Sequence, residues 1–168
     1  MANVRISGDT SGYVELQAPS VAGTTTLTLP TTSTEIPVIS TGTFTPAFDN
    51  GSFTYTTQDG NYYKIGDLVW VCYRLAWSAS SGTGDLDISG FPFTTKNDSN
   101  IFNGLTTAYL QGWELGANHG PPLFYFNPNT STVLARFGVD NGSPDTPEVP
   151  ELGGGSGQIM LTGVVYVE

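Results

Sequence analysis

Apolar and polar residues alternate along much of this chain, and this period of two is the pattern of half-buried β-strands. In the C-terminal three quarters of the sequence, short runs of this kind are bounded by Gly, Asn or Asp turn signals. They predict strands at residues 53–57, 62–65, 68–77, 85–88, 105–111, 123–126, 133–139 and 158–167. Many short, evenly spaced strands indicate an all-β fold, which we interpret as a jelly-roll-like β-sandwich.

The segment 68–77 is apolar on both faces and has Arg74 as its only charge. A strand of this kind is typical of the centre of a sheet, where both of its faces are covered. Together with the closing strand it carries more apolar surface than one small sandwich usually buries, so we expect a homotrimer. The side chains expected at the subunit interface are Val69, Val71, Tyr73 and Leu75.

The N-terminal part of the chain has few large apolar residues and many Thr and Ser. Residues 12–18 and 24–29 predict two strands joined by a turn at 19–23. Because an isolated two-stranded hairpin is marginal in water, this segment needs an external partner. We therefore divide the chain into an extended N-terminal β arm, residues 1–42, and a β-sandwich domain, residues 43–168. The residues expected to make assembly contacts from the arm are Tyr13, Val14, Leu16, Leu27 and Leu29.

The charge pattern argues against nucleic acid as a partner. Fifteen acidic and five basic residues give a formal net charge of −10, and the basic residues are scattered singly along the chain. Without a Lys or Arg cluster there is little to neutralise a phosphate backbone. The sequence also lacks an apolar signal region and any apolar run of membrane-spanning length, so we expect folding in a cytoplasm and no membrane partner.

Residues for catalysis or metal binding are sparse. Cys72 is the only cysteine and His119 the only histidine, so zinc ligation and an intrachain disulfide are excluded, and a Cys-His pair is a weak candidate. Asp85 and Asp87 are the nearest pair of acids for glycoside hydrolysis, but beside a Ser- and Gly-rich loop we expect both to be solvated and ionised. No phosphate loop or nucleophile elbow is present. The sequence therefore predicts a protein that is not an enzyme, with no catalytic, metal or cofactor site.

Aromatic residues are the remaining candidates for a binding role. Most aromatic side chains in a domain of this size lie in the core or at a subunit interface. A minority stack on sugar rings, with neighbouring acids or amides binding the hydroxyl groups. The candidates for such a glycan contact are Trp113, its neighbour Glu114, and Tyr125.

Two parts of the sequence resemble structural proteins of tailed phages. Residues 11–30 read SGYVELQAPSVAGTTTLTLP, which resembles a segment common near the N-termini of such proteins, especially those of cyanophages. Residues 42–46, 62–69 and 82–93 resemble a pattern found in small β domains of phage tail fibres and capsid decorations. Residues from about 97 onward match no pattern of this kind.

The resemblance implies a virion protein, assembled in the host cytoplasm, with a trimeric β-sandwich module and no active site. Because the chain is short and has no fibrous shaft, we expect a capsid cement or decoration protein whose arm binds the major capsid protein. The alternative is a short trimeric tail-fibre or receptor-binding protein that recognises a host surface glycan. A second alternative, from a different class, is a free-standing carbohydrate-binding module.

Overall fold

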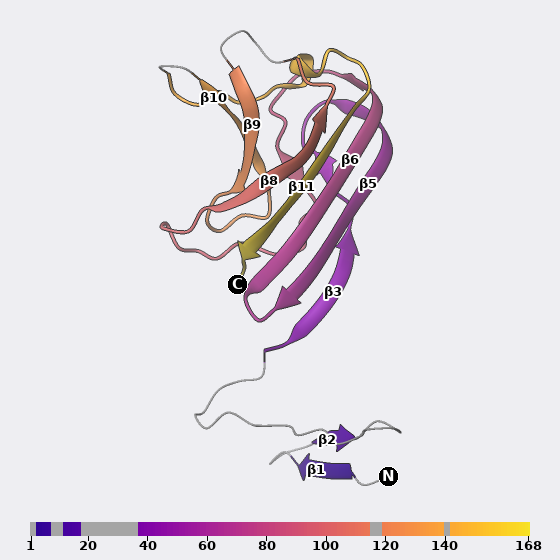
Figure 1. Ribbon diagram of the computed structural model, residues 1–168, viewed down its shortest axis with the longest axis vertical. Helices are drawn as coiled ribbons and strands as arrows, with labels where there is room; N and C mark the ends of the chain where they lie inside the picture. Colours follow the sequence, from indigo (N-terminus) through magenta and orange to yellow (C-terminus); the bar gives the residue numbers. More distant parts are fainter. Residues whose placement is uncertain (1–2, 8–11, 18–36, 115–118, 140–141) are drawn as a thin grey trace. The chain divides into compact units, whose positions relative to one another are not determined.

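The computed structural model describes residues 3–7, 12–17, 37–114, 119–139 and 142–168 (Figure 1). The chain divides into two compact units, Met1–Ile36 and Pro37–Glu168. The described elements are strands, apart from one short 3₁₀ helix, η1, at Val149–Leu152. The predicted all-β fold class is confirmed, with a large antiparallel sheet that fits a β-sandwich.

The first unit contains two antiparallel strands, β1 at Asn3–Ser7 and β2 at Tyr13–Gln17. The strand predicted at 12–18 is confirmed as β2. Its partner β1 was not predicted, because only Val4 and Ile6 alternate with polar residues in so short a run. The second predicted strand of the arm, with Leu27 and Leu29, lies outside the described residues, as do the side chains of Val14 and Leu16.

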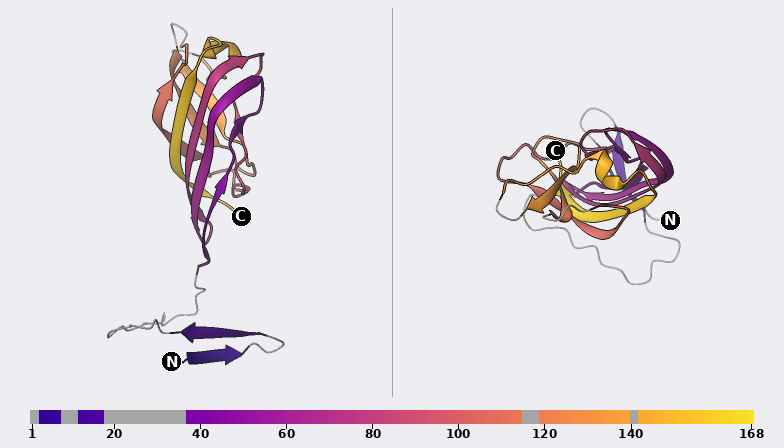
Figure 2. Two further views of the ribbon diagram at one scale, coloured as in Figure 1. Left: turned by 90° about the vertical axis from the view of Figure 1, so that its right-hand side faces the viewer. Right: turned by 90° about the horizontal axis from the view of Figure 1, so that it is seen from above.

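The second unit is built on a seven-stranded antiparallel sheet with the order β10-β9-β8-β11-β6-β5-β3. Its strands are β3 at Ile39–Phe44, β5 at Ser52–Ile65, β6 at Leu68–Ser81, β8 at Asn103–Gln111, β9 at His119–Phe126, β10 at Leu134–Val139 and β11 at Gly157–Tyr166. The two short strands β4 at Ala47–Phe48 and β7 at Ile88–Ser89 pair separately. The long sheet is strongly curved, and β9 and β10 turn away from the plane of β5, β6 and β11 (Figures 1 and 2).

Some strand boundaries differ from the prediction, in one case because residues typical of turns lie within a strand. The predicted strands 53–57 and 62–65 are one continuous strand, β5, because Asp59 and Gly60 pair with Arg74 and Tyr73 of β6 instead of forming a turn. The segment 85–88 contributes only the short β7. Strand β3 begins at Ile39, inside the part of the chain that we expected to be arm, and it pairs with β5 along its whole length.

Strand β6 lies between β11 and β5, so its predicted central position is confirmed. Val69, Val71, Tyr73 and Leu75 are fully or almost fully buried in the core of their own chain. This burial does not fit the subunit-interface role that we expected for these four residues, because no surface remains on them for a neighbouring copy. The face of β6 that is turned outward carries the alternate residues instead, among them Trp70.

The core fills the inner side of the curved sheet and is rich in aromatic rings. Trp77 of β6 meets Phe48 of β4 edge to face at a centroid distance of 5.5 Å. Phe91 meets Phe126 of β9 at 4.9 Å. These contacts join the small β4–β7 sheet and the loop that follows β7 to both halves of the large sheet, and they explain why residues 37–168 form one unit.

Candidate functional site

The expected glycan contacts do not form one platform. Trp113 follows β8 and packs against the core, with its ring edge to face with Phe124 at 6.2 Å and with Phe137 at 6.5 Å. Glu114 is exposed and donates its backbone N–H to the carbonyl oxygen of Glu151 at 2.6 Å. Tyr125 lies on the opposite face of β9 from Phe124, because successive strand residues alternate in direction. Trp113 is therefore partly buried against the core, on the other side of β9 from Tyr125.

Tyr125 itself lines a groove on the outer side of β9 and β10. The groove has a volume of about 350 Å³ and includes Leu123, Arg136 and Pro144. The Tyr125 ring lies 6.4 Å from that of Phe102, so it is supported on one side. Of the three expected glycan contacts, Tyr125 lines this groove together with the Arg136 guanidinium group.

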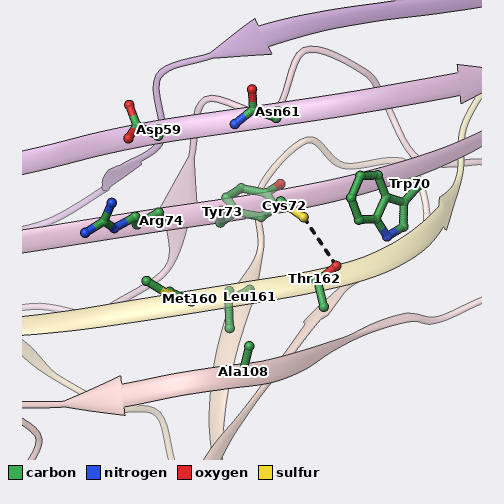
Figure 3. A pocket seen from close by; sticks show the side chains of 10 residues that line it. All are labelled: Asp59, Asn61, Trp70, Cys72, Tyr73, Arg74, Ala108, Met160, Leu161 and Thr162. Carbon is green, nitrogen blue, oxygen red and sulfur yellow. Dashed lines mark hydrogen bonds between the residues drawn. The ribbon is translucent and has the colours of Figure 1, made fainter.

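A second hollow lies on the outer face of the large sheet, where four neighbouring strands contribute side chains (Figure 3). Its volume is about 410 Å³ and its exposed surface is mostly apolar. Trp70 stands at one end with half of its surface exposed, and the Cys72 Sγ lies 3.5 Å from the Thr162 Oγ1 in the middle. The outward side chains that line it are Asp59, Asn61, Trp70, Cys72, Arg74, Ala108, Met160 and Thr162.

Sequence reasoning identified the two apolar faces of the segment 68–77 and assigned the subunit interface to the face that lies in the core. Trp70 and Cys72 alternate with the buried residues of β6, so the signal for the outer face was present. The contributions of β11 and β8 depend on strand pairing between segments that lie far apart in the sequence.

The two acids considered for hydrolysis differ in environment. Asp87 is half-buried, accepts a hydrogen bond from the Ala135 backbone N–H at 3.0 Å, and lies 3.6 Å from the Arg136 Nη1. Burial raises the pKa of the Asp87 carboxyl, and Asp85 and Asp49 add to this rise, while the Ala135 N–H and Arg136 oppose it. Asp85 is exposed. The expectation that both acids are solvated is therefore wrong for Asp87, which connects the segment before β7 to β10.

We expect Asp87→Ala to lower the free energy of unfolding by about 1–3 kcal/mol, because the Ala135 N–H loses its acceptor. Asp87→Asn keeps an acceptor oxygen and should cost less. Because the folded state raises the Asp87 pKa, the folded protein binds this proton more tightly than the unfolded chain does. The stability of the natural protein should thus fall, relative to Asp87→Asn, as the pH rises from the ordinary Asp pKa through the raised value.

Urea unfolding across this pH range measures both effects. The matched control is Asp85→Ala, since its side chain is exposed and should change the free energy of unfolding by no more than about 0.5 kcal/mol. Equal losses in the Ala variants at positions 85 and 87 would contradict the assigned role of Asp87.

His119 is the first residue of β9 and contacts one aromatic ring and two carboxylates. Its ring stacks on Phe137 with a centroid distance of 4.7 Å. The Nε2 is 3.5 Å from the Asp145 Oδ2, and the Nδ1 is 3.8 Å from the Glu151 Oε1. The polar neighbours of His119 are thus carboxylates, whereas Cys72 contacts Thr162, so the structure shows no Cys-His pair between these two residues.

No three or more of the described His, Cys, Asp and Glu side chains are arranged to hold a metal ion. Within the same part of the chain, no helix is long and apolar enough to cross a membrane.

Comparison with known proteins gives a likeness of fold. No protein-family model matches the chain, and no curated protein sequence matches it. Among solved structures, the chain is similar to the crystal structure of the Dettilon tailspike protein, with a TM-score of 0.61 and 21% sequence identity. The likeness covers 77% of this chain and 24% of the tailspike chain, so this chain matches about a quarter of the length of that protein. At this identity the comparison shows that the matched part of this chain has the same fold as the matched quarter of the tailspike chain.

Proposed function

We propose that this chain is a non-enzymatic structural component of a phage virion, located on the tail as part of a tail fibre or tailspike. The observation that carries the proposal is the fold shared with the Dettilon tailspike protein, at a TM-score of 0.61. The resemblance of residues 11–30 to tailed-phage structural proteins supports it independently, since it rests on sequence. In this role residues 37–168 form the β-sandwich module, and residues 1–36 attach it to the rest of the particle.

The tail replaces the capsid as the proposed location. The sequence resemblance includes both tail fibres and capsid decorations, and the short chain led us to expect a cement protein bound to the major capsid protein. The structural likeness is to a tail protein, so it favours the tail-fibre alternative.

The setting of the candidate catalytic groups supports a role without enzymatic activity. Asp87 accepts a backbone hydrogen bond, and His119 stacks on a buried Phe and lies between two carboxylates. Each of these groups has a structural contact that accounts for its position. For binding of a host glycan, the groove lined by Tyr125 is the site that we propose.

Locating the protein on purified virions tests the proposal. We expect immunogold labelling at the tail, and a copy number far below that of the major capsid protein by quantitative mass spectrometry. A control antibody against the major capsid protein marks the head. Labelling across the head surface, with a copy number close to that of the major capsid protein, would contradict the tail location and support the cement alternative.

A further inference from the structure

The outer face of the large sheet carries apolar side chains in two neighbouring rows. Strand register places Ile65 of β5, Leu68 of β6 and Tyr166 of β11 side by side, and Ile39 of β3 continues this row. The next row contains Tyr63, Trp70 and Val164 from the same three strands. We call these seven residues the outer patch: Ile39, Tyr63, Ile65, Leu68, Trp70, Val164 and Tyr166.

Every residue of the outer patch is substantially exposed, from 39% for Tyr63 to 59% for Ile39. Single exposed apolar residues are normal on a soluble protein, but a contiguous patch marks an interaction surface. Three of the seven are Trp or Tyr, which are enriched at protein interfaces because they bury a large area at a small entropy cost. The composition of the outer patch is therefore that of a protein contact.

Charge on this face points to the identity of the partner. The chain has a formal net charge of −10, so two copies repel each other through most of their surface. In the register of the five described strands β3, β5, β6, β11 and β8, the charged residues on the outer face are Asp59 and Arg74, which lie opposite each other. On this face these strands thus carry one charge of each sign, so they bring no net charge to an identical face.

The shape of this face also suits contact with an identical face on a second copy of the chain. Trp70 projects at one end of the hollow in Figure 3, and small side chains such as Cys72 and Ala108 lie along it. The volume of about 410 Å³ leaves room for an indole ring. A projecting ring and a hollow on one surface are what a self-complementary contact needs, since each copy supplies both.

We infer that the outer face of β3, β5, β6, β11 and β8 is the surface through which copies of this chain pack on one another, with the outer patch at the end of this face where β5 and β6 join. Sheets that pack face to face interdigitate the side chains of their facing rows, which suits two such faces. The inference does not depend on the position of the chain in a virion, so its failure and that of the proposed function are separate outcomes.

The test measures the mass of the purified full-length chain by light scattering and analytical ultracentrifugation. The natural protein is expected at a multiple of 17.8 kDa, two copies or more. Trp70→Glu and Val164→Glu are expected to give the mass of a monomer, because each places a charge in the centre of the outer patch. Both side chains are about half exposed, so the folded chain should accept either change, and circular dichroism with thermal unfolding verifies this.

Leu123→Glu is the matched control. Leu123 is also an exposed apolar residue on a strand, at 64%, but it lies on β9 outside the proposed surface. This variant should keep the mass of the natural protein. A monomeric natural protein at micromolar concentration would overturn the inference, and so would unchanged oligomers in both patch variants or equal dissociation by Leu123→Glu.

Cys72 gives a second measurement that needs no substitution. It is the only cysteine of the chain and lies on the outer face beside Trp70, so its thiol should be protected in the oligomer. Labelling by a thiol reagent is expected to accelerate when the natural protein is diluted, and to be fast at every concentration in Trp70→Glu. A rate that is the same across the dilution series and in both proteins would contradict packing on this face.

Discussion

Deletion of residues 1–36 is expected to leave residues 37–168 folded and to abolish incorporation of the chain into virions. The second unit contains the whole described hydrophobic core, including Trp77, Phe126 and Ile159, so its stability should not require the first unit. The described part of the first unit is a two-stranded sheet, which is marginally stable at best by itself, so we expect it to gain stability by binding a partner. Attachment should therefore be lost while the fold remains.

Complementation of a phage that lacks the gene measures this outcome. The truncated and full-length chains are supplied from the same plasmid, and purified particles are analysed for each by mass spectrometry. Cooperative unfolding of the truncated chain, followed by circular dichroism, verifies its fold. Truncated chains on particles at the full-length level would show that attachment uses another surface, and a truncated chain that does not fold would contradict the independence of the second unit.

Much of the fold was predictable because apolar and polar residues alternate in strands that have one buried face. The central position of β6 followed from apolar residues on both of its faces. Which of its two faces is buried could not be predicted, since a period of two shows only which residues share a face. That choice depends on β11, which pairs with β6 across a long sequence separation and places Val164 beside Trp70 on the outside.

The errors in strand boundaries have local causes. Asp59 and Gly60 form a common turn sequence, yet β5 continues through them because the Phe44 ring of β3 packs where a side chain at position 60 would stand. A glycine in a strand can mark such a close approach as well as a turn. The surrounding sequence does not distinguish these two uses, so the turn prediction failed here.

The candidate sites were less predictable than the fold because their residues meet only after folding. Trp113 and Glu114 are neighbours in sequence, but the indole ring packs against the core while Glu114 is exposed. Asp87 lost its expected exposure because Ala135, far along the chain, comes within hydrogen-bond distance. In both cases the environment of the side chain is set by a residue that is distant in sequence, so the local sequence could not predict it.

Gly157→Ala is expected to destabilise the second unit by about 3 kcal/mol, near the upper end of the usual cost of overpacking. Gly157 begins β11 and lies opposite Trp77 of β6. A Cβ at this position would overlap the Trp77 ring and lie 2.7 Å from the carbonyl oxygen of Gln111. Neither neighbour can move easily, because Trp77 packs edge to face against the rings of both Phe48 and Phe53, and the Gln111 oxygen belongs to the backbone of β8.

Gly104→Ala is the matched control for this prediction. Gly104 is also a strand glycine, in β8, but a Cβ there would meet no atom within 4 Å. Its substitution should leave the free energy of unfolding within about 0.5 kcal/mol of the natural value. Urea unfolding of the two variants and the natural protein gives the comparison. If Gly157→Ala is as stable as Gly104→Ala, the close packing of Gly157 against Trp77 and the Gln111 backbone is not as described.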